Sequence, residues 1–189
     1  MFQFLKPLEF PKPYADRVAR LRVPSGFLIV IVFAVFSHPT ARSLAIGLPV
    51  SVLGLGLRAW AAGSVAKNQR LATGGPYAYA RNPLYVGTLL VAAGLVIACR
   101  SLGLGALFAA VFLFVYLPVI QLEEQHLRRL FPEYAAYAAE VPALCPRLKP
   151  FPQKNPNPFR AGLYLTNKEY QAGVGLIAGM LFLVWKMLG

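Results

Sequence analysis

Two adjacent carboxylates, Glu123 and Glu124, follow a long uncharged run that ends at Gln121. Carboxylates this close to hydrocarbon are costly unless they have partners. They could bind an amine, a ligand that carries a sulfonium, or ribose hydroxyls; the structural alternative is an i,i+4 ion pair between Glu124 and Arg128. Pro118, inside the uncharged run, removes one backbone hydrogen bond and predicts a kink just before the two acids.

A second polar stretch, residues 67–87, reads KNQRLATGGPYAYARNPLYVG and contains a Gly-Gly-Pro turn at residues 74–76. Pro83 falls at the expected first position of the following helix, where a missing N–H costs nothing. The free N–H groups of that helix start, with Arg81 before them, could hold a carboxylate or a phosphate. The alternative is a tight loop whose tyrosines lie at the membrane surface.

Apolar helices must position these polar residues, because 57% of the 189 residues are hydrophobic and only 14% are charged. A soluble domain carries about 25% charged residues, so the composition predicts an all-α integral membrane protein. The length allows about five transmembrane helices in a single domain, residues 1–189, without a separate soluble domain. A cleaved signal peptide is not expected, because no small-x-small site directly follows Ser37. The expected spans are approximately residues 23–37, 43–63, 84–99, 102–121 and 171–188.

The formal charge of +12, from 19 basic and 7 acidic residues, would suggest nucleic acid binding in a soluble domain. Most of the basic residues fall instead on one side of the expected spans, in the N-terminal segment and in the loops after the second and fourth spans. The positive-inside rule then places the N-terminus and the active site in the cytoplasm of a bacterium, or on the cytosolic side of the endoplasmic reticulum in a eukaryote, and the C-terminus on the opposite side. The expected partner is therefore the lipid bilayer and its anionic headgroups, not nucleic acid.

Two further sequence features bear on metals and on assembly. The sequence has no Cys and His spacing typical of a zinc site, so no metal is expected. Cys99 and Cys145 are expected on opposite faces of the membrane, too far apart for a disulfide. Gly175 and Gly179 form one GxxxG, a weak signal for close helix packing that leaves the oligomeric state open.

Several short motifs in the middle of the chain occur in the order found in a known family. They are Gly75-Pro76-Tyr77, Arg81-Asn82-Pro83-Leu84-Tyr85-Val86-Gly87, Glu123-Glu124, Phe131, Tyr134, Tyr137 and Val141-Pro142. Over roughly residues 69–146, this ordered set resembles the integral-membrane methyltransferases, which include isoprenylcysteine carboxyl methyltransferases and phospholipid N-methyltransferases.

The resemblance implies S-adenosylmethionine as the methyl donor, bound on the cytosolic side, with S-adenosylhomocysteine as the product. It implies a lipophilic acceptor, such as a lipid amine or a prenylcysteine carboxylate, which enters from the bilayer. Arg81 and Tyr85 are the implied catalytic residues, Arg81 by holding the cofactor carboxylate or a lipid phosphate. The implied cofactor-binding residues are Gln69, Arg70, Leu71, Ala72, Tyr77, Asn82, Pro83, Leu84, Tyr85, Glu123 and Glu124.

The sequence departs from the family at a few positions, and two other functions stay in view. Val119 stands where the carboxyl methyltransferases have an arginine that contacts substrate, which argues against a prenylcysteine carboxylate. Asn82 stands where His is usual. Sterol and steroid reductases that use NADPH share an Arg-x-Pro-x-Tyr-x-Gly stretch, but their Gly is followed by Glu, whereas Thr88 follows Gly87 here. A non-enzymatic membrane scaffold is the third hypothesis.

Overall fold

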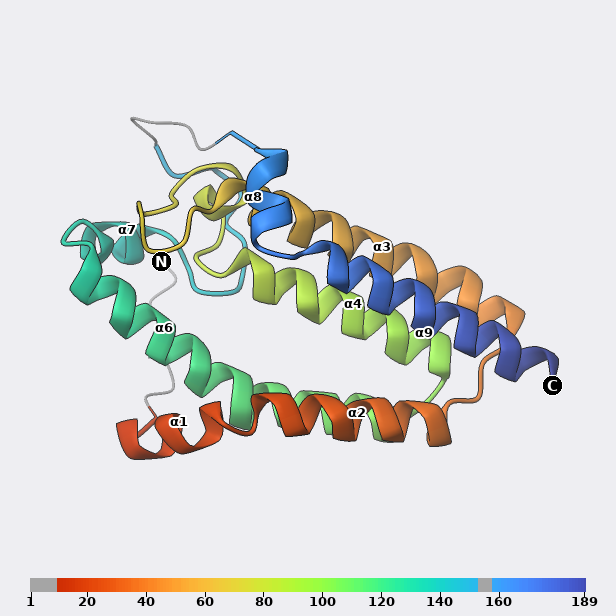
Figure 1. Ribbon diagram of the computed structural model, residues 1–189. Coiled ribbons are helices and arrows are strands. Elements are labelled where there is room, and N and C mark those ends of the chain that lie inside the picture. The colour runs from red at the N-terminus through yellow and green to blue at the C-terminus, as the bar shows by residue number, and fades with distance from the viewer. Residues whose placement is uncertain (1–9, 153–157) are drawn as a thin grey trace.

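The computed structural model describes residues 10–152 and 158–189, which form helices and loops without a strand (Figure 1). The all-α prediction is therefore confirmed for this part of the chain. Residues 153–157 of the proline-rich connector, and Lys6 of the basic N-terminal segment, lie outside the described residues. In chain order the elements are α1 (Lys12–Ala19), α2 (Arg22–Phe36), α3 (Ala41–Ser64), the 3-10 helix η1 (Gly75–Ala78), α4 (Pro83–Cys99), α5 (Leu102–Val111), the π-helix η2 (Phe112–Tyr116), α6 (Leu117–Leu130), α7 (Tyr134–Glu140), α8 (Ala161–Thr166) and α9 (Tyr170–Leu188).

Every expected span coincides with helical structure, although the fourth continues beyond Gln121 to Leu130. Three helices are long and apolar enough to cross a membrane, namely α3, the continuous helix Leu102–Leu130, and α9. The 17 residues of α4 extend about 25 Å, slightly less than a bilayer core of about 30 Å. Helices α1 and α2 meet the same criteria only as one pair bent by 57°. Five membrane crossings, and their orientation, thus stay predictions.

The closest helix pair is α3 and α4, because glycines on both helices let the two backbones approach. A Cβ atom added to Gly54 would lie 2.6 Å from the Val91 nitrogen, and one added to Gly87 would lie 2.8 Å from the Gly54 oxygen. Ser51 donates from the same face to the Val91 carbonyl at 3.1 Å. This packing fixes α4, whose first turn carries the arginine-proline motif, against α3.

The helix that carries the two acids is continuous from Leu102 to Leu130 and has a π-helical turn close to Pro118, whereas the kink predicted there stays a prediction. The π-helical turn η2 directly precedes Pro118, which lies in the first turn of α6. In a regular helix the Phe114 carbonyl would accept the N–H that a proline at 118 lacks. The hydroxyl of Tyr14 donates to this carbonyl at 2.9 Å instead. The N-terminal segment therefore supports the helix where its own hydrogen bonding is interrupted.

A second contact fixes the N-terminal segment next to the acids. The side-chain amide of Gln121 accepts from Phe10 N at 2.8 Å and donates to Phe10 O at 3.1 Å.

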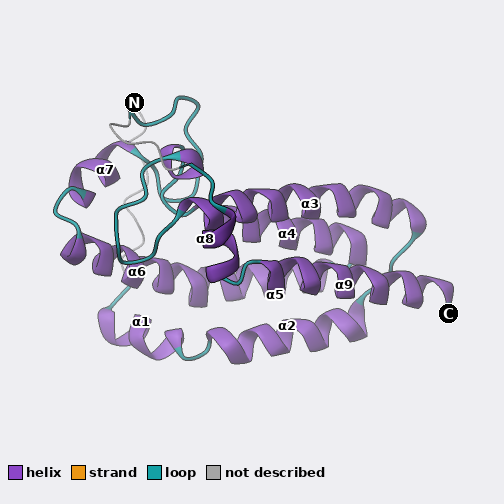
Figure 2. Cartoon of the chain, turned by 45° about the horizontal axis from the view of Figure 1, so that its top comes forward, coloured by secondary structure: helices purple, strands orange, loops and turns teal. Residues whose placement is uncertain are grey.

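Helices α3, α4 and α9 run side by side, and α2 and α5–α6 lie along them (Figures 1 and 2). The loops around η1, with α7 and α8, gather at one end of this bundle, and the C-terminus lies at the other (Figure 2).

Candidate functional site

Arg81 and Glu124 form the central ion pair at the loop end of the bundle. Nε and Nη2 of Arg81 donate to the two carboxylate oxygens of Glu124 at 2.8 and 3.0 Å, and the two side chains are only 12% and 14% exposed. Two parallel charge-assisted hydrogen bonds give such a pair a defined geometry. Glu124 thus has a structural partner, but this partner is Arg81 and not Arg128, the i,i+4 alternative; the Arg128 guanidinium lies 5.5 Å from the ring centroid of Tyr134.

The remaining donor of Arg81 binds backbone rather than pointing into open space. Nη1 donates to the carbonyls of Ala138 and Val141, each at 2.8 Å. Burial lowers the pKa of Arg81, but the hydrogen bond and the charge of Glu124 raise the pKa by more, so the net shift is upward. Arg81 is thus a permanent cation that joins α4, α6 and the end of α7.

Asn82 and its neighbours extend this junction through the backbone. Asn82 donates from Nδ2 to Glu124 at 3.0 Å and from its backbone N–H to the Ala143 carbonyl at 3.0 Å. Arg81 N donates to Pro142 O at 2.9 Å, and Arg147 N donates to Tyr79 O at 2.9 Å. The segment before α4 is therefore held against the segment that follows α7, residues 141–151.

The second acid, Glu123, lies beside the first turn of α4. It accepts a hydrogen bond from the Tyr85 hydroxyl at 3.0 Å and is nevertheless an exposed residue. The ring of Tyr85 is buried among Phe112 and Ile120 and contacts Tyr116 edge-on, with centroids 6.1 Å apart. The structure thus combines an accessible carboxylate with a buried aromatic wall.

The predicted cofactor-binding loop before η1 packs against the same end of the bundle. Leu71 contacts the cluster of Tyr134, Tyr137 and Val141, whereas Ala72 and Tyr77 pack on Ala61 of α3. The Tyr137 hydroxyl donates to Tyr77 O at 2.7 Å. Gln69 is exposed, and Nη2 of Arg70 is buried without a hydrogen-bond partner in the described part of the chain.

Three tyrosines in this region have raised pKa values, and burial is the main cause in each. Burial raises the pKa of Tyr77, which the negative charge of Glu123 raises further. Burial likewise raises the pKa of Tyr134, with an added contribution from Glu124, and that of Tyr137. The cluster is therefore neutral at physiological pH and remains so well above the ordinary tyrosine pKa of about 10.

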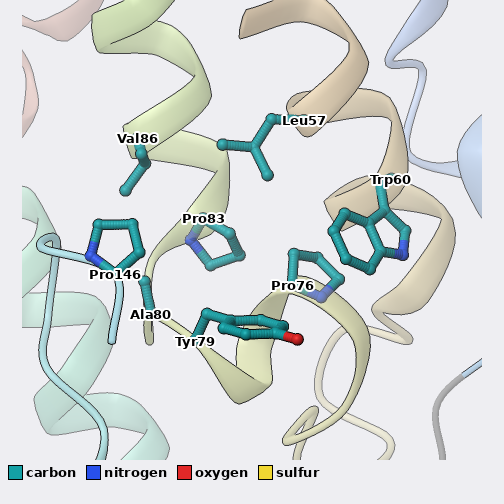
Figure 3. Close-up of a pocket in the computed structure, with 8 residues that line it drawn as sticks. All are labelled: Leu57, Trp60, Pro76, Tyr79, Ala80, Pro83, Val86 and Pro146. Carbon is teal, nitrogen blue, oxygen red and sulfur yellow. The ribbon is translucent and has the colours of Figure 1, made fainter. Parts of the chain in front are cut away.

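An apolar cavity of about 350 Å³ lies between α3, η1 and the start of α4 (Figure 3). Leu57 and Trp60 of α3 form one wall, and Pro83 and Val86 of α4 form another, with Tyr79 across the opening (Figure 3). None of its lining residues is charged. Of the predicted site residues only Pro83 lines it, so this cavity adjoins the ion pairs without containing them.

The sequence analysis missed one polar cluster, which lies within the helices. Arg58 of α3 donates from Nε to Glu169 at 2.6 Å and from Nη1 to the hydroxyl of Thr88. Arg58 stands out in the sequence as the single charge within its span, and an intramembrane charge requires a partner. The sequence signal for this partner is Glu169 itself, an acidic residue directly before the last apolar run, residues 171–188.

The chain matches the model of the phospholipid methyltransferase family over residues 49–134. It is 41% identical over 107 residues to the cobalt-zinc-cadmium resistance protein CzcN of Cupriavidus metallidurans. This alignment covers 53% of this chain and 50% of that protein. It is 35% identical over 126 residues to the nickel-cobalt-cadmium resistance protein NccN of Alcaligenes xylosoxydans xylosoxydans. This alignment covers 64% of this chain and 59% of that protein.

The chain thus spans between half and three fifths of these curated relatives. No solved structure matches it. The described residues contain no group of three His, Cys, Asp or Glu side chains that could hold a metal ion. The matched region includes Arg81, Tyr85, Glu123 and Glu124, and it confirms over residues 49–134 that this chain resembles the integral-membrane methyltransferases.

Proposed function

We propose that this protein transfers a methyl group from S-adenosylmethionine to a lipophilic acceptor on the cytoplasmic side of a membrane. The main support is the convergence of two family motifs at one end of the bundle, where Arg81 pairs with Glu124 and Tyr85 donates to Glu123. Both motifs lie within the matched residues 49–134. This family match also favours methyl transfer over NADPH-dependent reduction.

The residues near these pairs have the chemistry that the donor requires. Glu123 is exposed, so its carboxylate is accessible to an ammonium group or to ribose hydroxyls. Arg70 has a buried Nη2 without a partner among the described residues, which suits a carboxylate because buried donors are normally satisfied. We therefore assign Glu123 to the cationic or sugar part of the donor and Arg70 to its carboxylate, with Leu71 and Tyr77 as neighbouring walls.

Arg81 and Glu124 have a different role in this proposal. All three guanidinium nitrogens of Arg81 donate to protein acceptors, and both carboxylate oxygens of Glu124 accept from Arg81. These two side chains are therefore positioning residues that fix the helix start of α4 relative to α6. This assignment differs from the direct contact with the donor expected from the sequence for Arg81 and for Glu124.

Bound at this site, S-adenosylmethionine supplies a methyl group on a sulfonium whose positive charge is lost during transfer. The chain contributes orientation through Glu123 and Arg70, and it excludes water through the aromatic wall of Tyr85, Phe112 and Tyr116. The Tyr85 hydroxyl positions the Glu123 carboxylate by a hydrogen bond of 3.0 Å. The acceptor nucleophile approaches from the apolar side of α4.

The direct test is calorimetry of the purified full chain in lipid nanodiscs with S-adenosylmethionine. We expect micromolar binding that Glu123→Gln weakens about tenfold or more, because a hydrogen bond to a charged group contributes about 1.5–3 kcal/mol. Glu133→Gln is the matched control, since Glu133 is an exposed acid beyond the site. Binding of NADPH in place of S-adenosylmethionine would support the reductase, and no binding of either would support the scaffold.

The names of the two relatives support a second, compatible proposal, that the protein acts in resistance to heavy-metal ions. The test is growth of cells that express the chain on graded cobalt, zinc, cadmium and nickel salts. Protection that Glu123→Gln abolishes would link resistance to the same site. Equal growth with and without the chain would contradict the proposal.

A further inference from the structure

A second cavity, of about 530 Å³, lies between α2, α4 and α9. Its walls are apolar apart from Arg58 and Thr88, and include Phe33 of α2, Leu95 of α4 and Leu176 of α9. The volume falls in the range of about 300–1,000 Å³ that is typical of ligand pockets. One of its walls is α9, which is long and apolar enough to cross a membrane, so in a bilayer the cavity would adjoin lipid.

The α9 wall of this cavity is built from small residues. No atom lies within 4 Å of a Cβ added to Gly175, and one added to Gly179 would meet only the Phe33 ring, at 3.8 Å. Gly175 therefore faces open space and Gly179 faces the Phe33 side chain, whereas such motifs usually bring two helix backbones together. Val30, across the cavity on α2, is 62% exposed, and Gly175 is exposed as well, so the cavity opens on the surface that faces lipid.

Arg58 gives the cavity one polar position. Its Nε binds Glu169 and its Nη1 binds Thr88, and its Nη2 makes no hydrogen bond to a described residue. The Glu169 side chain is 8% exposed, so the Arg58 charge is already neutralised by a buried carboxylate. An additional anion would carry an uncompensated charge into a medium of low dielectric constant. An uncharged hydrogen-bond acceptor has no such cost.

The polar end of the cavity lies close to the proposed methyl-transfer site. Tyr85 and Thr88 are three residues apart on α4, which is about 4.5 Å along the helix axis. Positions three apart also share one side of a helix. Tyr85 does not line the cavity, but a molecule whose polar group reaches Arg58 beside Thr88 lies within about one helical turn of Tyr85 along α4.

We propose that this cavity binds one hydrocarbon chain of a membrane lipid, and that Arg58 selects lipids with an uncharged acceptor, such as an ester carbonyl or a hydroxyl, at that depth. The apolar walls bind the chain, the small residues of α9 provide the space, and Nη2 of Arg58 donates to the acceptor oxygen. That this lipid is the methyl acceptor rests on the proposed function; that the cavity binds it does not.

The test is photolabelling of the full chain in nanodiscs with a diacylglycerol that carries a diazirine in one acyl chain, followed by mass spectrometry of the labelled peptides. We expect labels on α2 and α9, reduced at least fivefold by Gly175→Leu, which fills the cavity. Gly56→Leu is the matched control, because Gly56 is also a helical glycine with open space around its Cβ position but does not line the cavity. Equal labelling of the two variants would overturn the proposal.

The polar selection is tested with phosphatidic acid that carries the same labelled chain. We expect at least fivefold less labelling than with diacylglycerol, and loss of this difference in the double variant Arg58→Met with Glu169→Gln, which leaves no unpaired charge. Stronger labelling by the anionic lipid would overturn the role of Arg58. S-adenosylmethionine binding, measured on the same samples, separates the two proposals, since Gly175→Leu should retain that binding and lose only methyl transfer to lipid.

Discussion

Removal of the Arg81 side chain should loosen the junction between α4, α6 and residues 141–151. Arg81→Met removes two charge-assisted hydrogen bonds to Glu124 and two hydrogen bonds to backbone carbonyls. It also leaves the Glu124 carboxylate, which is only 14% exposed, without Arg81; of the two donors Arg81 and Asn82, Asn82 alone would remain. Breaking one side of a buried pair costs about 3–5 kcal/mol. Because the pair is slightly exposed, we expect about 3 kcal/mol.

A double-mutant cycle separates the pair from the other contacts of Arg81. Arg81→Met, Glu124→Gln and the combined variant are compared by the free energy of unfolding in mixed micelles. The expected coupling energy is about 2 kcal/mol, since hydrogen bonds to charged groups contribute about 1.5–3 kcal/mol. Proteolysis in the 141–151 loop should increase in both single variants.

The chain provides its own reference for a weak ion pair. Arg147 and Glu140 are 3.9 Å apart, and their side chains are 28% and 57% exposed. Exposed pairs of this kind contribute about 0–1 kcal/mol, so the same cycle on Arg147 and Glu140 should give a coupling energy within error of zero. A coupling between Arg81 and Glu124 as small as this reference would refute their assignment as positioning residues.

Three other predictions concern packing, the π-helical turn and pH. Gly54→Leu should prevent folding or lower the free energy of unfolding by more than about 3 kcal/mol, because the new leucine side chain would meet the Val91 backbone. A yield of folded protein equal to that of Gly56→Leu would contradict this prediction. Tyr14→Phe should lower the free energy of unfolding by about 1 kcal/mol, because the Phe114 carbonyl loses its donor; an unchanged melting temperature would show that the contact does not stabilise the helix. The raised pKa values of Tyr77, Tyr134 and Tyr137 mean that the unfolded chain loses these protons first, so their contribution to stability is complete below pH about 10 and falls as the pH rises above it. Unfolding midpoints measured between pH 8 and 11 should show this decline, which Tyr137→Phe should reduce, whereas stability that rises over this interval would contradict the sign.

Helix positions followed from local sequence, whereas partners did not. Long apolar runs bounded by charges or by proline predicted α3, α4 and α9 to within two residues at each end, because hydrocarbon-compatible helices need continuous apolar sequence. Pro118 indicated interrupted helical hydrogen bonding, and the π-helical turn η2 lies just before it, although the form of the interruption was not predicted. For Glu124 the same reasoning offered only Arg128 as a protein partner, beside a role in binding a ligand, since only neighbours along the helix are visible in a sequence.

The sequence by itself determined the composition of the site: an acidic pair at the end of one apolar helix and an arginine-proline turn at the start of another, in the order that resembles the methyltransferases. Only the tertiary structure decided which atoms meet. It paired Arg81 with Glu124 across 43 positions and Arg58 with Glu169 across 111, and it turned a glycine motif toward a cavity. The physical reason is that a charge near hydrocarbon must be neutralised by whatever acid the packed helices bring within reach, and that distance in space is set by how α3, α4, α6 and α9 pack.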